Sequence, residues 1–285
     1  MSWHQQMMSQ EFMKIVMIGA GNVATHLAKA LVAAGHEIVQ VWSRTADSAL
    51  SLASAVGAEP LTDMACVCDD AGLYVLSVSD SALADVAGCL AHRRVKGVVA
   101  HTAGTVSMDV LRECGPRYGV IYPMQTFSKS VPVCFRHVPC FVEASDRDVT
   151  EFLKTVAESV SDNVRELTGQ DRRWLHVAAV LACNFANACY AMAAEVLESH
   201  DIDFSVMLPL IDETARKVHD VPPAKAQTGP AAREDYNVMA SHRALLSENA
   251  SVLKVYDLMS QVIIERRCKA RAMEHAPDAE SQPVL

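Results

Sequence analysis

KIVMIGAGNVA, residues 14–24, runs from a short apolar segment into the pattern Gly19-x-Gly21-x-x-Ala24 and then into an amphipathic helical pattern. This order is typical of a dinucleotide-binding turn, in which the first glycine permits a tight turn and the second leaves space for a pyrophosphate. The free N–H groups and the positive dipole end at the start of the helix favour such an anion. The predicted phosphate contacts are Gly19, Ala20, Gly21, Asn22 and Val23. The alternative is a purely structural corner between strand and helix.

The composition is that of a globular protein of about two domains. The chain has 285 residues, of which 51% are hydrophobic and 21% are charged, and its net charge is −9. It contains no basic run. Nucleic acids and anionic membrane surfaces are therefore poor candidates for partners, because neither would be attracted electrostatically.

The nine cysteines have no spacing typical of a metal site, so no metal is expected. Most of them fall in apolar segments, which predicts small buried side chains in a reducing compartment. The first residues, MSWHQQMMSQEF, lack the basic and apolar regions of a signal peptide. The apolar stretch around 177–183 looks too short to span a bilayer. We therefore expect a cytoplasmic protein.

The order of the elements predicts the fold class. Strand patterns at 37–43, 73–78, 95–101 and from residue 119 alternate with helical patterns, as in βαβ units with a parallel sheet. From Asp171 to about Cys268 only helical patterns occur. The prediction is an α/β fold with a Rossmann-type, doubly wound, mostly parallel sheet, followed by an all-α domain. The expected boundaries are 13–168 for the dinucleotide-binding domain, 169–270 for the helical domain and 271–285 for a mobile tail.

Three details of the helices follow from their sequences. Asp80 is expected to cap the helix that follows the third strand, and Asp171 to cap the long helix of the second domain. Pro209 is expected to kink the next helix. The long helix is apolar almost all round and needs cover on every side, so we expect a homodimer formed through the helical domain.

The end of the second strand indicates which coenzyme is preferred. NAD enzymes place an acid there to bind the ribose 2′-hydroxyl, whereas this chain has Ser43, Arg44 and Thr45. A guanidinium group and hydroxyl groups would bind a 2′-phosphate, which favours NADP. The alternative is a solvated arginine in a loop.

The loops after the later strands, at 78–80, 101–104 and 122–126, are expected to face the nicotinamide. The reason is that ligands of open α/β sheets bind at the carboxyl ends of the strands. Val78 and Ser79 lie at the end of one strand and are expected to contact the cofactor. Their expected role is to pack and to form the turn, not to react. His101 ends the next strand and is a candidate general acid, or a histidine satisfied by the backbone. Gln125, with Thr126, could orient a substrate carbonyl or amide, or only bind within its own loop.

The long helix carries His176, Asn184 and Asn187 among apolar residues. In a regular α-helix, His176 and Asn187 would differ by about 20° in azimuth and about 16 Å in height, with Asn184 between them in height. This polar stripe could present a proton donor and an amide to a substrate, or cross-link packed helices.

A sharp turn at Thr228-Gly229-Pro230 precedes Arg233 and Asp235. Thr228 and Arg233 are substrate-side candidates, and Arg233 could clamp a carboxylate. The alternative is a surface ion pair between Arg233 and Asp235. Lys217 is a weaker candidate, which could act as a base if it is buried.

The chain resembles a bacterial family that joins a Rossmann-like NADP-binding domain to a helical domain of unknown function. It is more distantly similar to pyrroline-5-carboxylate reductase and to deazaflavin-dependent NADP oxidoreductases. The resemblance covers roughly residues 13–268 and is carried by GAGNVATHLA (19–28), VSDSAL (78–83), HTAGTVSMDVL (101–111), YPMQTFS (122–128), LHVAAVLACNF (175–185) and TGPAAREDYNV (228–238). The resemblance implies a cofactor cleft and a dimer built on the helices. It does not indicate which reaction is catalysed. Relatives usually have glycine where this chain has Glu234, which questions the tightness of that turn.

The sequence thus predicts an NADP-dependent oxidoreductase that moves hydride between the nicotinamide and a C=N or C=O carbon of a small molecule. The cofactor would perform the difficult chemistry, while the protein orients the reactants. The alternative is a dimer that binds NADP as a sensor or scaffold and does not turn it over, since fold does not imply function. A carrier of hydrophobic ligands is a third and weaker reading, because apolar helical stripes are usually core.

Overall fold

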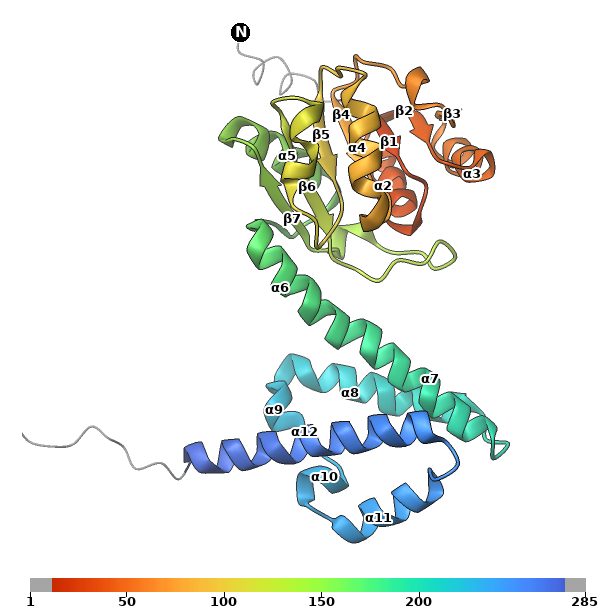
Figure 1. The fold of residues 1–285 in the computed structure, drawn as a ribbon, viewed down its shortest axis with the longest axis vertical. Coiled ribbons are helices and arrows are strands. Elements are labelled where there is room, and N and C mark those ends of the chain that lie inside the picture. The colour runs from red at the N-terminus through yellow and green to blue at the C-terminus, as the bar shows by residue number, and fades with distance from the viewer. Residues whose placement is uncertain (1–11, 275–285) are drawn as a thin grey trace, which may run out of the picture. The chain divides into compact units, whose positions relative to one another are not determined.

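The structure is a computed structural model that describes residues 12–274. The chain divides into two compact units, Met1–Phe185 and Ala186–Leu285 (Figure 1). The predicted domain boundary at residues 168 and 169 stays a prediction. Of the predicted tail, residues 271–274 are helical, and residues 275–285 lie outside the described residues.

The first unit is built on one sheet of eight strands, in the order β3-β2-β1-β4-β5-β6-β7-β8. All neighbouring strands pair in parallel except β6 and β7. The predicted Rossmann-type, mostly parallel sheet is therefore confirmed. The strands are β1 (Lys14–Ile18), β2 (Glu37–Trp42), β3 (Glu59–Leu61), β4 (Leu73–Leu76), β5 (Val98–His101), β6 (Tyr118–Pro123), β7 (Cys140–Ala144) and β8 (Val164–Glu166).

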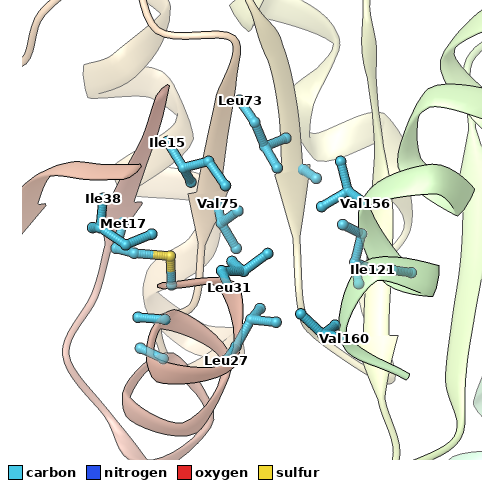
Figure 2. Packing of buried hydrophobic residues seen from close by; sticks show 14 of the residues in the cluster. Ile15, Met17, Leu27, Leu31, Ile38, Leu73, Val75, Ile121, Val156 and Val160 are labelled. Atoms are coloured by element: carbon cyan, nitrogen blue, oxygen red, sulfur yellow. The ribbon is translucent and has the colours of Figure 1, made fainter. Parts of the chain in front are cut away.

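Both faces of the sheet are buried, which is why its strands are rich in apolar residues. Alternate residues of β1 show this: Ile15 and Met17 pack on one face, and Val16 and Ile18 pack on the other. Side chains of α2 (Asn22–Ala33) and α5 (Arg147–Val160), such as Leu27 and Val156, cover the first face (Figure 2). Side chains of α4 (Leu83–Ala91) cover the second face. The helices of this unit before the long helix are α2 (Asn22–Ala33), α3 (Ala46–Val56), α4 (Leu83–Ala91) and α5 (Arg147–Val160).

A continuous helix, Gly169–Glu198, follows β8. It consists of α6 (Gly169–Ala179), a π-helical turn (Val180–Asn184) and α7 (Phe185–Glu198). The prediction of a regular α-helix is wrong at the π-helical turn. A π turn contains more residues than an α turn, so the predicted azimuths of Asn184 and Asn187 relative to His176 do not hold.

The same helix corrects the estimate that the apolar stretch is too short for a bilayer. By length and composition alone, Gly169–Glu198 could cross a membrane, and none of its most apolar window is buried inside the structure. Large apolar side chains recur along it with helical spacing, at Trp174, Val177, Leu181 and Phe185. The chain alone therefore leaves an apolar helix face uncovered.

The second unit is all helical in its described residues, as predicted. Its helices after α7 are α8 (Leu208–Asp220), α9 (Pro223–Ala226), α10 (Pro230–Arg233), α11 (Tyr236–Leu245) and α12 (Ala250–Glu274). Two polar contacts join α11 to α12: His242 Nδ1 lies 3.0 Å from the Tyr256 hydroxyl, and Arg243 pairs with Asp257.

Several local predictions need correction. Asp80 does not cap α4, because its carboxylate accepts a hydrogen bond from Thr105. Thr168, not Asp171, caps α6, because its hydroxyl accepts the Asp171 N–H while Asp171 lies inside the first turn. Pro209 does not kink α8, since it occupies the first turn, where its missing N–H costs nothing.

The turn that contains Glu234 forms despite the side chain. Glu234 has φ +59° in the left-handed region, ends α10 with backbone hydrogen bonds, and accepts a bond from Arg271. Asp235 then caps α11 by accepting the Val238 N–H. The expected burial of most cysteines is wrong for the single chain, because only Cys114 and Cys140 are buried.

Candidate functional site

The strand order places a crevice at the carboxyl end of β1. The chain runs from β1 outwards through β2 and β3, then returns to β4 on the other side of β1. Such a reversal is where open α/β sheets bind ligands. A cavity of about 850 Å³ lies there, within the first unit. It is lined by most of the predicted site residues: Gly19, Ala20, Gly21, Asn22, Val23, Ser43, Arg44, Val78, Ser79, Gln125 and His176.

Gly19 and Gly21, the two glycines of the first turn, are needed for different physical reasons. Gly19 has φ +115°, and a Cβ atom there would collide with the Ser77 carbonyl group, so the fold itself needs glycine. Gly21 has φ −78°, which any residue adopts, and a Cβ atom there would meet nothing within 4 Å. The space in front of Gly21 opens into the cavity. The fold therefore gives no reason for glycine at position 21, whereas an approaching pyrophosphate does.

The first turn of α2 is suited to an anion. Gly21 is its N-cap, and no acidic residue lies in that turn. Its first N–H groups have no partner within the helix and point along the positive end of the dipole. Asn22 and Val23 line the cavity here. The turn thus offers donors and positive potential to a diphosphate, so its residues fit a pyridine dinucleotide.

The cavity continues past the end of β2. Ser43, Arg44, Thr45 and Ser48 line it there, and the Thr45 hydroxyl donates to the Ser48 hydroxyl at 2.8 Å. No acidic residue from this loop lines the cavity. A guanidinium group among hydroxyl groups matches the needs of a phosphate group.

The other end of the cavity holds a tyrosine and a histidine in contact. The Tyr122 hydroxyl, at the end of β6, lies 3.1 Å from Nδ1 of His176 in α6. Burial raises the pKa of Tyr122 above its usual value, against a smaller lowering by Arg172, so the phenol is protonated at neutral pH. Gln125 also lines the cavity, and its carboxamide oxygen accepts the Thr126 N–H.

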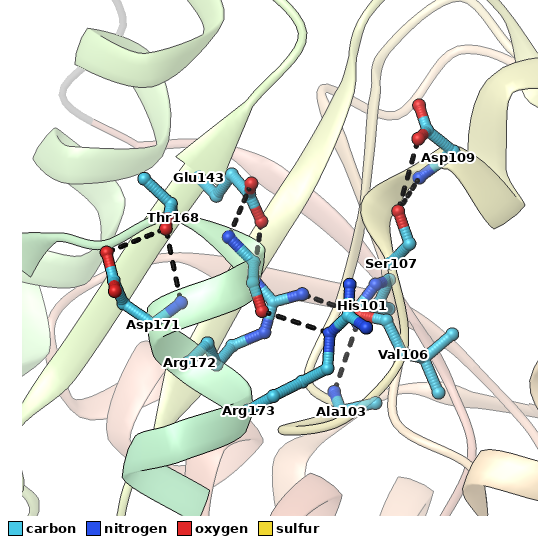
Figure 3. A network of polar contacts seen from close by, with 11 residues as sticks. His101, Ala103, Val106, Ser107, Asp109, Glu143, Thr168, Asp171, Arg172 and Arg173 are labelled. Atoms are coloured by element: carbon cyan, nitrogen blue, oxygen red, sulfur yellow. Dashed lines mark hydrogen bonds and ion pairs between the residues drawn. The ribbon is translucent and has the colours of Figure 1, made fainter.

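A buried ion pair holds the start of α6 on the sheet (Figure 3). Arg172 donates to Glu143 of β7 at 2.5 Å and to the Val106 carbonyl at 2.6 Å, and its side chain is only 1% exposed. Glu143 also accepts the Gly169 N–H. Because Arg172 lies one turn before His176, this network sets where His176 meets Tyr122.

His101 lies near this network and not on the cavity wall. It is fully buried, and its Nδ1 accepts the Ala103 N–H at 3.1 Å. Burial and, to a smaller extent, the Arg172 charge lower its pKa to about 4. At neutral pH His101 is therefore an uncharged hydrogen-bond acceptor.

Four other candidates lie outside the cavity lining. Asn184 is exposed on the π-helical turn. Thr228 and Arg233 are exposed in the second unit, and their contact with a substrate stays a prediction. Lys217 is exposed and lies near Glu213. It therefore lacks the burial that the role of a base requires.

Tyr122 and Gly104 line the cavity, and both belong to loops that the sequence predicts to face the nicotinamide. Lys129 also lines the cavity, and no pattern in the sequence predicted it. The contact of Tyr122 with a histidine 54 residues further along the chain left no local pattern either.

Comparisons with known proteins agree with this geometry. Residues 14–104 match the model "NADP oxidoreductase coenzyme F420-dependent", and residues 138–263 match "Domain of unknown function (DUF2520)". A Bacteroides fragilis protein, provisionally described as an NADP oxidoreductase, is 47% identical, covering 90% of this chain and 99% of its own, with a TM-score of 0.86. Comparison with curated proteins gives no match.

Two more distant structures share the fold. An imine reductase from Myxococcus stipitatus, solved in complex with NADP+, is 16% identical over 90% of this chain and 94% of its own, with a TM-score of 0.67. A pyrroline-5-carboxylate reductase from Coxiella burnetii is 16% identical over 90% and 98% of the two chains, with a TM-score of 0.55. The chain therefore belongs to a family of NAD(P)-dependent oxidoreductases in which a domain of the coenzyme F420-dependent NADP oxidoreductase type precedes a DUF2520 domain.

Proposed function

We propose that the protein binds NADP(H) along this cavity and transfers hydride between the nicotinamide and a C=N or C=O carbon of a small molecule. The observation that carries the proposal is Gly21, where the fold tolerates a side chain and a bound pyrophosphate does not. The names of the similar proteins, an NADP oxidoreductase, an imine reductase and a pyrroline reductase, support the same reaction class.

The chain's own residues would bind and orient the reactants. Gly19 to Val23 hold the diphosphate, and Ser43 with Arg44 holds the 2′-phosphate. Val78 and Ser79 pack beside the nicotinamide end, and Gln125 and His176 face the substrate. When bound, the cofactor supplies or accepts the hydride.

The preference for NADP is tested by titrating the protein with NADPH and NADH. We expect tighter NADPH binding, and we expect Arg44→Ala to weaken NADPH binding by roughly tenfold while leaving NADH binding nearly unchanged, because only NADPH carries the 2′-phosphate. The equivalent change at Lys129, which lines the same cavity, provides a matched cationic control. Tighter NADH binding, or an unchanged preference in Arg44→Ala, would contradict this assignment.

Turnover is tested by following NADPH oxidation with cyclic imines, 2-oxo acids and a deazaflavin. Oxidation that depends on one of these classes supports the enzyme. If NADPH binds tightly and every class fails, the sensor or scaffold dimer gains support. The polar groups of Tyr122, Gln125 and His176 beside the cofactor path favour the enzyme, since a sensor needs only the adenine and phosphate contacts.

We also propose that two copies associate through the helical domain in the cytoplasm. The uncovered apolar face of Gly169–Glu198 supports association, because a second copy would remove it from water. In the second unit Leu208, Leu210 and Val218 are exposed as well. The nine free cysteines support a reducing compartment.

A further inference from the structure

Tyr122 and His176 are two side chains of the cavity lining that lie within hydrogen-bond distance of each other. Tyr122 comes from the carboxyl end of β6 and His176 from α6, and both line the cavity. Their Oη and Nδ1 atoms are 3.1 Å apart, and their ring centroids are 6.2 Å apart. The Tyr122 side chain is otherwise buried, so its hydroxyl is held rather than free to rotate away.

Gly104 makes room for this pair. A Cβ atom at position 104 would lie 2.6 Å from His176 Nδ1 and 3.0 Å from Tyr122 Cζ. The φ of Gly104 does not lie in the left-handed region, so its backbone does not require glycine. The missing side chain thus serves the contact between the two rings and not the turn.

We propose that Tyr122 is the catalytic acid of the reduction, and that His176 is a positioning residue whose Nδ1–H donates to the phenol oxygen. The inference rests on the proposed function, and it assigns the proton donor that the proposed function leaves open. In this arrangement the phenol proton points into the cavity and is available to a substrate.

When bound, NADPH would supply the hydride that the C=N or C=O carbon gains, and would be oxidised to NADP+. The π-electron pair moves to the nitrogen or oxygen, which takes the proton of Tyr122 as the O–H bond of the phenol breaks. The Nδ1–H of His176 stabilises the phenolate that forms. After the product leaves, Tyr122 takes a proton from solvent.

If Tyr122 donated to His176 instead, Tyr122 would have a structural role and not a catalytic one. If Nε2 of neutral His176 carried the proton, Nδ1 would accept from the phenol. The phenol proton would then point at the imidazole, and the pair would be a structural contact. The two tautomers therefore separate a catalytic tyrosine from a structural one.

The tautomer can be measured without cofactor or substrate. The full-length protein is labelled with ¹⁵N-histidine, and the His176 resonances are assigned as those lost in His176→Asn. We expect a protonated Nδ1 and an unprotonated Nε2 in neutral His176, and a shift toward the Nε2–H tautomer in Tyr122→Phe. A wild-type protein with Nε2–H and an accepting Nδ1 would overturn the inference.

Kinetics give a second test, using the imine or carbonyl compound that the screen identifies. Tyr122→Phe should lower kcat by at least about 100-fold, the usual contribution of a general acid, with NADPH affinity changed less than about threefold. Tyr118→Phe, the same change in the same strand and outside the cavity lining, should leave kcat unchanged. A loss smaller than about 100-fold in Tyr122→Phe would contradict the assignment.

NADPH calorimetry distinguishes failure of the proposed function from failure of the role assigned to Tyr122. A wild-type protein without NADPH affinity would overturn the proposed function and this inference with it. A protein that binds NADPH but holds His176 as the Nε2–H tautomer would overturn this inference alone.

Discussion

His101 shows how a single buried side chain couples folding to pH. Its pKa is about 4 in the folded protein, against 6.5 for an ordinary histidine, because burial and then Arg172 disfavour the charged ring. As the pH falls from about 6.5 to about 4, the unfolded chain binds a proton that the folded chain does not. The wild-type protein should therefore lose roughly 3 kcal/mol of unfolding free energy through His101 over this interval, and no more below it.

Urea unfolding of wild type and His101→Asn between pH 7.5 and 4 checks this prediction. Asparagine keeps an acceptor for the Ala103 N–H but does not titrate. The variant should lose less stability than wild type as the pH falls, with the remaining slope coming from other groups, such as the half-buried His36, whose pKa is lowered by burial. Equal slopes in the two proteins would refute the role assigned to His101.

At the scale of elements, the start of the long helix depends on one of two adjacent arginines. Arg172 is buried against Glu143, whereas Arg173 donates to the Gly169 carbonyl at the surface. Arg172→Ala should cost about 3–5 kcal/mol of unfolding free energy, because it leaves Glu143 without its buried partner. Arg173→Ala should change stability by less than about 0.5 kcal/mol. Denaturant unfolding of both variants measures the difference, and similar losses would contradict the role of the network.

The same helix shows what the sequence could and could not predict about elements. The strand–turn–helix order at β1 and α2, the alternation through β8 and the helical second unit follow local patterns of hydrophobicity and turn residues. Thr168 and Asp171 could each cap α6, and only the backbone path decides between them. The π-helical turn leaves no periodic signal of its own. The sequence RRW does not reveal which arginine is buried, since that depends on a glutamate from another strand.

At the scale of the whole molecule, the uncovered apolar helix is the main feature that the single chain leaves unexplained. Trp174 is 69% exposed and Leu181 is 59% exposed. If a second copy covers this face, Leu181→Glu should shift the sedimenting species from dimer to monomer. Leu50→Glu, at an exposed leucine of α3, should leave the dimer intact. A monomeric wild type, or a dimeric Leu181→Glu, would contradict association through this face.

The sequence could predict residues that a motif or a strand end brings to the cavity, and it could not predict the contacts between residues of distant segments. Gly19 to Val23, Ser43 and Arg44 lie together on the cavity as expected from a single motif and the end of a strand. Tyr122, His176 and Gly104 meet only through the fold. Contacts on the substrate side generally join distant segments in this way, because strands distant in sequence contribute their carboxyl ends to one crevice.

The claim that a dinucleotide lies across Gly21 is tested most directly by NADPH calorimetry on wild type, Gly21→Ala and Gly88→Ala. Both glycines have open space at the Cβ position, but only Gly21 lines the cavity. We predict that wild type and Gly88→Ala bind NADPH alike, and that Gly21→Ala binds at least about tenfold more weakly with its thermal midpoint retained. Absence of NADPH binding in wild type, or equal affinity in Gly21→Ala, would contradict the account.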